Sequence, residues 1–501
     1  MRLLNGAWRL LYLISPLLHI FGFTVLFWGP LFTPYYFLFW MCMQTSYTIY
    51  VTSDTCIKLL LIYKSARQFL QQQKSRIVSS SQETQHVILV PNYTEELDLL
   101  RQTLRNLASH SLSETNYYVV LAQEEKEKSS VKKAEILISE FNTLFKDMFY
   151  TVHPFGIPGE LEGKASNVNW AARHVYKILV EERGMNIDDI LVTIADADSI
   201  IPEEFFIYTG EKYSKLTSPK EVCFEANPIY SVNSFKVSGF QRAVDLAHAS
   251  LIMMQQRNYM GQSFPYSTYA LSLNLIHAVD YWDCQPEAIG EDYHMYLKCF
   301  YKSQGRMIRI TCPVPVFLAS VEAENMWKSL IGRFKQTIRH MLGFYDIAYG
   351  ISMFLQNITR ISFIRNIAIL YNTLESLIFS ILVPYFQLGM AIWRFLPIAD
   401  GYQELFETYR FMLTWLLLVP IVLFLVLAFI YERIYKLMIS EMTYQPMGEK
   451  RSWGQYLDWL WLFFITPFFV WLPAFYVSFA KTFPSNNFKY IVAPKGKQDL
   501  I

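Results

Sequence analysis

Long apolar stretches at both ends of the chain constrain its fold more than any other feature. Residues 10–28 and 35–53 form two of them, and residues 366–390, 411–431 and 457–480 form the others. A helix of about 20 apolar residues spans the hydrocarbon core of a bilayer, which is roughly 30 Å thick. We therefore expect an integral, multi-pass membrane protein whose ordinary globular sequence lies between its apolar ends.

Basic residues set the expected orientation. Four cations between residues 58 and 74 follow the second apolar stretch, and basic loops stay on the cytosolic side. The globular region is therefore expected in the cytosol, beside the plasma membrane or the Golgi and ER membranes. Pro467 and Pro473 interrupt the last apolar stretch, so we expect a broken or re-entrant element that returns the basic tail to the cytosol.

Composition excludes some partners. Only 17% of the residues are charged, against about 25% in soluble domains, and the net charge of +1 indicates no nucleic-acid partner. The cysteines form no C-x-x-C pair, so neither a zinc site nor a disulfide framework is indicated. We expect free thiols at all six positions: Cys42, Cys56, Cys223, Cys284, Cys299 and Cys312.

The chain divides into five expected regions. Two transmembrane helices occupy residues 1–56, and an interfacial helix with a linker occupies 57–84. A globular domain covers 85–345. A further interfacial helix and the C-terminal transmembrane helices follow at 346–480, and a cytosolic tail at 481–501 ends the chain.

The globular domain alternates between strand and helix patterns. Short apolar runs predict strands, and longer amphipathic segments predict helices. This alternation is typical of a mostly parallel, Rossmann-like α/β sheet covered by helices. The expected strands are 87–90, 117–121 and 190–195, and the expected helices are 95–109, 129–146 and 166–183.

Two carboxylates end the third expected strand. Asp196 and Asp198 follow the apolar run 190–195, and open α/β sheets bind ligands at the carboxyl ends of their strands. Two carboxylates there can hold Mg²⁺ or Mn²⁺, which can neutralise a diphosphate. A single D-x-D is also typical of turns and helix caps, so its neighbours decide between the two interpretations.

Three further motifs accompany the D-x-D. Tyr93 and Glu95 lie in a loop after the first strand, where a ring can stack on a base; a plain loop with a helix cap is the alternative. Glu124, after the second strand, can bind a base or ribose, or it can belong to a solvated surface run. Lys164 begins a helix, where its ammonium and the helix dipole together suit a diphosphate; a solvated lysine is the alternative.

The last motif is acidic. Trp282 precedes Asp283, and Glu291 and Asp292 begin an amphipathic helix. Asp292 could act as the general base that deprotonates an acceptor hydroxyl. A pair of helix N-cap residues is the alternative.

Together, these motifs resemble those of the membrane-bound family 2 glycosyltransferases, which include cellulose, chitin and hyaluronan synthases and ceramide glucosyltransferase. The resemblance implies a GT-A-like catalytic domain at 85–345, inserted between transmembrane helices. It also implies a nucleotide-sugar donor, a glycan or lipid acceptor, membrane lipid around the helices, and Mg²⁺ or Mn²⁺ as cofactor. By resemblance, Tyr93, Glu95 and Glu124 would bind the nucleoside, and Lys164 would bind the diphosphate. Asp198, with Asp196, would bind the metal. Asp292 would act on the acceptor, with Glu291 and Trp282 beside it.

Two segments depart from the family pattern, and a third resembles it. Gln123-Glu124-Glu125 replaces the usual acidic pair, which leaves the nucleoside contact open between Glu124 and Glu125. Gln336 and Arg339 match the Gln-x-x-Arg-Trp motif of processive members, but His340 replaces the tryptophan that offers a sugar an aromatic platform. The tail around Lys495 resembles the gating loop of cellulose synthase.

The acceptor stays open at this point. A β-linked polysaccharide is slightly favoured, made by an inverting transfer in which a single base acts in a single step. Transfer of one sugar to a lipid is the alternative. A transporter or channel with a regulatory domain is disfavoured, because Glu375 is the one clear carboxylate within the apolar stretches.

Overall fold

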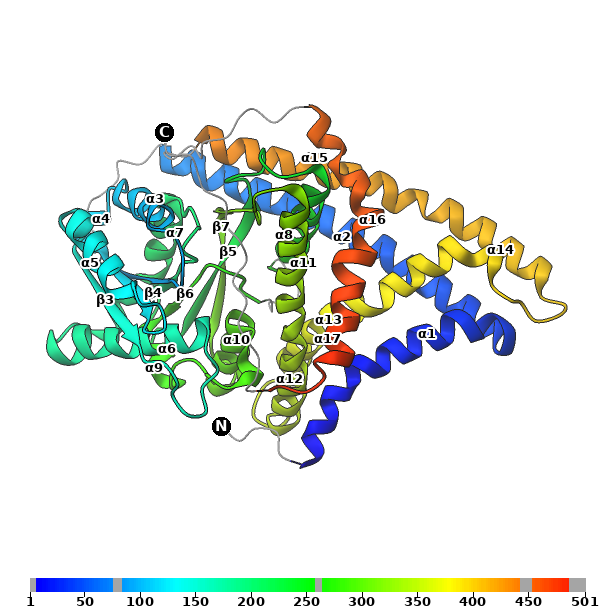
Figure 1. Ribbon diagram of the computed structural model, residues 1–501, viewed down its shortest axis with the longest axis horizontal. Helices are drawn as coiled ribbons and strands as arrows, with labels where there is room; N and C mark the ends of the chain where they lie inside the picture. The colour runs from blue at the N-terminus through cyan, green and yellow to red at the C-terminus, as the bar shows by residue number, and fades with distance from the viewer. Residues whose placement is uncertain (1–5, 75–82, 257–263, 442–452, 486–501) are drawn as a thin grey trace.

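A computed structural model describes residues 6–74, 83–256, 264–441 and 453–485 (Figure 1). A sheet covered by helices forms one side of the molecule, and long helices extend from it on the other side. The seven strands are β1 (Gln85–Pro91), β2 (Tyr117–Glu124), β3 (Asp147–His153), β4 (Ile190–Ile194), β5 (Val222–Tyr230), β6 (Tyr269–Ser272) and β7 (Ile308–Leu318).

The sheet is mostly parallel, as the sequence predicts. Its order is β3-β2-β1-β4-β6-β5-β7, and only β6 runs antiparallel to its neighbours. The central strands β2 and β4 are buried along their whole length, which is typical of parallel strands with helices on both faces. The order brings the carboxyl ends of β1, β2 and β4 to one edge.

Alternate residues of each strand face different helices, because successive side chains point to opposite faces. Ile88 and Val90 join the cluster that includes residues of α3 (Leu97–Ala108), α5 (Ser130–Phe141) and α7 (Glu203–Tyr213). Val87 and Leu89 join the cluster with α6 (Lys164–Val175), α9 (Leu273–Ala278) and α10 (Glu291–Lys302). The remaining helices of this part are α4 (Ser113–Asn116), α8 (Gly239–Gln256), α11 (Met326–Met341) and α12 (Tyr345–Gln356).

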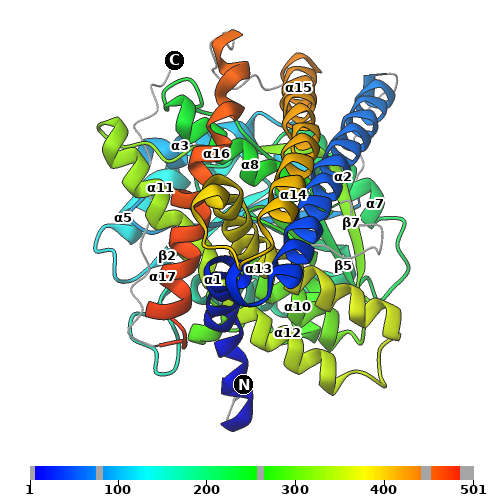
Figure 2. The same ribbon diagram turned by 90° about the vertical axis from the view of Figure 1, so that its right-hand side faces the viewer.

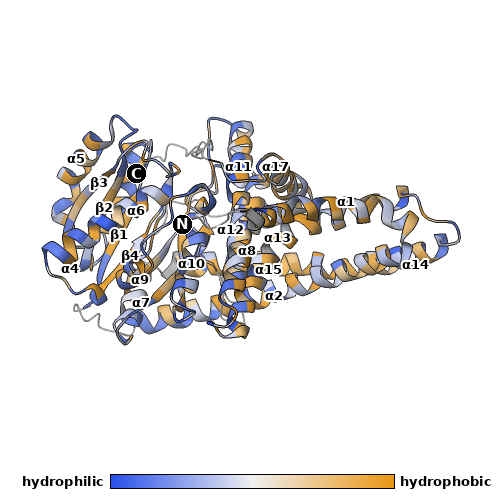
Figure 3. Cartoon of the chain, turned by 90° about the horizontal axis from the view of Figure 1, so that it is seen from below, coloured by the Kyte–Doolittle hydropathy of each residue, from blue (hydrophilic) through white to orange (hydrophobic). Residues whose placement is uncertain are grey.

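The long apolar helices form an arm that projects from the sheet (Figure 3). Figure 2 looks along this arm and shows α13 among the other helices. The arm contains α1 (Ile14–Phe32), α2 (Pro34–Lys74), α13 (Phe363–Ile392), α14 (Gln403–Leu416) and α15 (Leu418–Glu441). At its base, α16 (Leu462–Thr466) packs against α8, and α17 (Leu472–Ala480) packs against α11.

Among the described residues, two helical stretches are long and apolar enough to cross a membrane. They are Arg9–Phe32 and Gln403–Met438. A bent pair, Phe363–Glu375 and Ser380–Phe395, gives a third if the two parts count as one span. The last apolar segment is broken, as expected, and its helical part Phe464–Ala480 is shorter than a full span. The remaining spans of the expected multi-pass arrangement stay predictions.

Three local expectations differ from the structure. Residues 57–74 continue α2 instead of forming a separate interfacial helix, and their apolar residues pack into the core of the globular domain. Lys58, one of the cations used to predict orientation, is buried and paired with Asp54 at 2.5 Å. The helix expected at 129–146 ends at Phe141, so that β3 can begin at Asp147 and join the sheet edge. All six cysteines are free, as predicted.

Candidate active site

One cavity of about 1090 Å³ opens at the carboxyl ends of β1, β2 and β4 and continues beside α10, α11 and α13. Most residues singled out from the sequence line it, although they come from segments far apart in the chain. These are Tyr93, Glu95, Glu124, Lys164, Asp196, Asp198, Glu291, Asp292, Gln336, Arg339 and His340. Trp282 is not among the lining residues, and Lys495 lies outside the described residues.

The loop after β1 has a fixed conformation. Thr94 adopts a positive φ of 64°, which is uncommon for a residue with a Cβ. Its N–H donates to Glu127 Oε2 at 3.0 Å, and Glu127 also pairs with Lys133 at 2.7 Å. Lys133 in turn donates to the carbonyl of Glu95 at 3.1 Å. Tyr93 and Glu95 are therefore held at the cavity wall by contacts outside the cavity.

Glu124 belongs to a chain of three titratable side chains. Its Oε2 lies 3.0 Å from His153 Nδ1, and His153 Nε2 lies 3.1 Å from Glu160 Oε2. Burial raises the pKa of Glu124. Burial alone would lower the pKa of His153, but the two carboxylates raise it. An imidazole ring that bonds two carboxylates therefore supports this wall.

The structure also separates Glu124 from Glu125. Glu124 and Glu160 line the cavity, whereas Glu125 is exposed and accepts the N–H of Phe155 at 2.8 Å. Sequence reasoning missed His153 and Glu160, because it predicts no strand between the helix expected at 129–146 and Lys164. The parallel pairing of Glu124 with His153 is the signal that would have found the histidine.

Lys164 connects the D-x-D with the Glu291-Asp292 pair. Its Nζ lies 2.8 Å from Asp196 Oδ1 and 3.1 Å from Glu291 Oε2, and it donates to the carbonyl of Ser267 at 3.3 Å. Burial would lower the pKa of Lys164, but the carboxylates of Asp196, Glu291 and Asp292 raise it. The ammonium therefore stays charged at neutral pH.

The D-x-D lies at the end of β4, as predicted, and both carboxylates face the cavity. Ser267 Oγ donates to Asp196 Oδ2 at 2.6 Å. Thr103 Oγ1 donates to the carbonyl of Ala197 at 2.7 Å and fixes the turn between the two aspartates. Within the described residues, no group of three or more His, Cys, Asp or Glu side chains is placed to hold a metal ion.

Both members of the Glu291-Asp292 pair line the cavity, and Glu291 is the more buried of the two. Glu291 is 6% exposed and accepts a hydrogen bond from the hydroxyl of Tyr269. Burial raises its pKa to about 7, against the opposing effect of Lys164. Asp292 instead accepts two backbone N–H groups, from Ser267 at 3.0 Å and from Tyr293 at 2.9 Å. These two bonds fix its carboxylate at the cavity wall.

Trp282 does not occupy the expected position in contact with substrate. Its side chain is buried, and its indole N–H donates to Tyr269 Oη at 3.0 Å. Tyr269 donates onward to Glu291. Trp282 therefore supports Glu291 from behind, because the indole needs a partner for its N–H once it is buried.

Helix α11 brings Gln336, Arg339 and His340 to the far end of the cavity. The rings of His340 and His248 stack, with centroids 5.2 Å apart and planes inclined by 13°. His248 also lines the cavity, and its Nδ1 lies 2.9 Å from Tyr230 Oη. No sequence motif predicts a role for His248, because it lies on α8, far from the α11 motif.

Two comparisons with known proteins bear on this site. A family model described as glycosyl transferase family group 2 matches residues 191–431, which include the D-x-D, the Glu291-Asp292 pair and the α11 motif. No curated protein matches the chain.

A solved structure is also similar: the mannosyltransferase PcManGT from Pyrobaculum calidifontis in complex with GDP-Man and Mn²⁺. It is 14% identical, with 76% of this chain and 98% of that chain covered and a TM-score of 0.42. The match to the family model, rather than this structural similarity, supports a glycosyltransferase of family group 2.

Proposed function

We propose that the protein is a membrane-bound inverting glycosyltransferase that moves a sugar from a nucleotide-sugar donor to a hydroxyl group of a growing β-linked polysaccharide. The observation that carries this proposal is that one cavity brings three kinds of group together. They are the polar side chains after β1 and β2, the Lys164 ammonium, and the Asp292 carboxylate held by two backbone N–H groups. Such convergence of polar groups in a large cavity is typical of an active site.

The residues of the cavity have distinct roles in this proposal. Tyr93, Glu95 and Glu124 bind the nucleoside, and Lys164 binds the diphosphate. Asp292 takes the proton of the acceptor hydroxyl, whose oxygen then attacks the anomeric carbon. The bond from that carbon to the diphosphate breaks, and its electron pair leaves with the nucleoside diphosphate. One displacement inverts the configuration, so an α-linked donor gives a β-linkage.

The charge of the site supports a divalent cation. Lys164 is the ammonium that lies among the carboxylates of Asp196, Glu291 and Asp292, with Asp198 nearby on the same wall. This leaves an excess of negative charge beside the expected diphosphate. Asp196 and Asp198 would hold Mg²⁺ or Mn²⁺, which often uses one or two carboxylates together with phosphate oxygens. When bound, the ion supplies positive charge to the leaving diphosphate.

A lipid acceptor is the second candidate, and one observation favours it. The cavity continues past α11 to apolar side chains of the arm and its base, among them Leu377, Ile465 and Phe469. Glu375 and Tyr47 line the same end, and Tyr47 Oη donates to Glu375 Oε1 at 3.2 Å. An apolar chain with a hydroxyl head fits this lining as well as a glycan does.

A panel of sugar nucleotides tests the proposal. The purified full chain is incubated with each donor and with Mg²⁺ or Mn²⁺, and released nucleoside diphosphate is measured. We expect release from one donor class, and we expect it to stop when the metal is chelated. Glu125→Gln is the matched control, because Glu125 is an exposed carboxylate beside Glu124 that does not line the cavity. Release from no donor, with or without metal, would contradict the proposal.

A further inference from the structure

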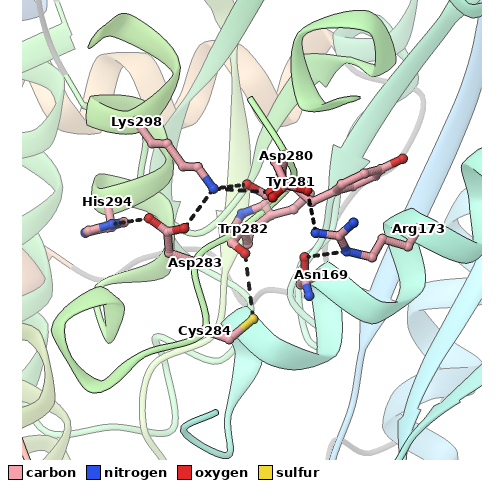
Figure 4. Close-up of polar contacts among 9 residues, drawn as sticks. All are labelled: Asn169, Arg173, Asp280, Tyr281, Trp282, Asp283, Cys284, His294 and Lys298. Atoms are coloured by element: carbon pink, nitrogen blue, oxygen red, sulfur yellow. Dashed lines mark hydrogen bonds and ion pairs between the residues drawn. The ribbon is translucent and has the colours of Figure 1, made fainter. Parts of the chain in front are cut away.

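A buried charged cluster lies behind the Glu291-Asp292 pair and outside the cavity lining. His294 Nε2 lies 3.1 Å from Asp283 Oδ2, and His294 Nδ1 lies 2.5 Å from Asp346 Oδ1. Lys298 Nζ lies 2.8 Å from Asp283 Oδ1 and also donates to the carbonyl of Tyr281 at 2.8 Å. Figure 4 shows Lys298 and His294 converging on Asp283. The imidazole is thus held between two carboxylates from different segments.

The cluster balances its charges only while His294 is protonated. His294, Lys298 and Asp346 are each less than 4% exposed, and a buried charge is costly unless it is paired. Burial alone would lower the pKa of His294, but Asp346 and Asp283 raise it to about 9. At neutral pH, two cations therefore face two carboxylates.

The cluster joins two walls of the cavity. Asp346 begins α12 beside Gly343, Phe344 and Ile347, which line the cavity near the α11 motif. Its Oδ2 would lie 2.9 Å from a Cβ placed on Gly290, the residue that precedes Glu291. A side chain at position 290 would collide with this carboxylate. The carboxylate of α12 therefore rests against the first turn of the helix that carries Asp292.

We propose that His294, held between Asp283 and Asp346, is a positioning residue. It holds the first turn of α10 against α12. Asp292 on that turn therefore keeps its position relative to the acceptor and to the cavity wall formed by α11 and α12. This inference rests on the proposed function, because it assigns Asp292 to the acceptor. A displacement of about 1 Å at a reacting group can cost on the order of 100-fold in rate, so a loosened clamp lowers kcat. The nucleoside end of the cavity is built by other segments, so donor affinity is unaffected.

The pH profile distinguishes positioning from mere structural support. The titratable groups around His294 and its partners are Asp346 and Tyr349 on α12, Asp283 on the preceding loop, and Asp292 and Lys298 on α10. Burial raises the pKa of Asp346 to about 6, so the clamp is complete only above that pH. The carboxylates of Asp346 and Asp283 raise the pKa of His294, so the clamp is lost again as pH rises through about 9. We expect kcat of the full chain to fall above that pH, with the donor Kd unchanged.

Two variants and one control complete the test. Asp346→Asn should move the alkaline fall of kcat down by about one pH unit or more, because an opposite charge at this distance shifts a pKa by about 1 to 3 units. His294→Gln should lower kcat at neutral pH by roughly 10- to 100-fold and remove the alkaline fall. The control is Glu225→Gln. Glu225 is a buried carboxylate that pairs with Arg309 at 3.2 Å, and it does not line the cavity. This variant should keep the wild-type pH profile even if its Tm falls.

The outcomes separate the clamp from the proposed function. If Asp346→Asn and His294→Gln keep the wild-type kcat and pH profile while Asp292→Asn is inactive, the clamp is wrong and the function stands. The positioning role is also wrong if Glu225→Gln, at a similar loss of Tm, loses as much kcat as Asp346→Asn and His294→Gln. If Asp292→Asn retains full transfer, the proposed function itself fails.

Discussion

The two ends of the cavity are built in different ways. The nucleoside end uses the carboxyl ends of parallel strands, where Tyr93 and Asp196 follow β1 and β4 and Glu124 is the last residue of β2. The acceptor end uses helices α8, α10, α11 and α12, whose buried pairs Arg333–Asp245 and His294–Asp346 join distant segments. Strand ends meet wherever a parallel sheet forms, whereas the helical wall depends on particular ion pairs. The comparison predicts that changes at one end alter donor binding and changes at the other alter transfer alone.

The largest effect on donor binding is expected from Asp198→Asn. The substitution removes charge from the proposed shell of the cation, so metal-dependent nucleotide binding and turnover should both be lost. Partners one shell further out are typically worth roughly 10- to 100-fold in metal affinity or activity, and a direct ligand should exceed that. Titration calorimetry with nucleoside diphosphate and Mn²⁺ measures the binding. If the variant binds the nucleotide with wild-type affinity but does not turn over, Asp198 serves transfer and not donor binding.

A smaller effect is expected from His153→Gln. The variant removes the imidazole that bonds both Glu124 and Glu160, and hydrogen bonds to charged groups are worth about 1.5 to 3 kcal/mol. We expect the KM for the donor to rise by about tenfold or more, with kcat little changed. The raised pKa of His153 means that wild-type KM should also rise as pH rises through that pKa, since the proton is then lost. A KM that shows the same pH dependence in the variant would exclude His153 as its source.

The smallest effect is expected from His340→Trp. His340 stacks on His248 at the acceptor end, and a larger ring should hold a sugar longer, because aromatic pairing is worth about 0.5 to 1.5 kcal/mol. If the product is a chain, it should lengthen, while donor KM stays unchanged. Gel sizing of labelled product gives the answer. If both proteins add only one sugar, the polysaccharide acceptor is excluded and the lipid acceptor is favoured.

The same contrast explains what the sequence could predict. The strands β1, β2 and β4, the D-x-D at the end of β4 and the cavity-facing positions of Lys164 and Asp292 follow from local patterns that depend on neighbours in the chain. His153 was missed because polar and apolar residues alternate too little along Asp147–His153 to predict a strand. Local patterns carry no information about contacts formed only after the helices have packed.

The helical wall shows this limit most clearly. His248 on α8 has its partner on α11, and Asp346 on α12 has its partner on α10. At least two other elements lie between the partners along the chain in each case. Trp282 was placed at the substrate because its motif neighbours are acidic, yet its burial behind Tyr269 is decided by the pairing of β6 with β4. Residues 57–74 look interfacial in isolation, and only the packed domain provides the surface that covers them.

The central claim is that Asp292 serves transfer and not donor binding. The most direct measurement pairs two readouts on Asp292→Asn, which keeps the size of the side chain and removes its basicity. A general base typically contributes about 10²- to 10⁴-fold to the rate, so transfer of labelled sugar should fall by that factor. The Kd for the nucleotide, measured by calorimetry in the same preparation, should stay near the wild-type value. Retained transfer with weakened nucleotide binding would contradict the account.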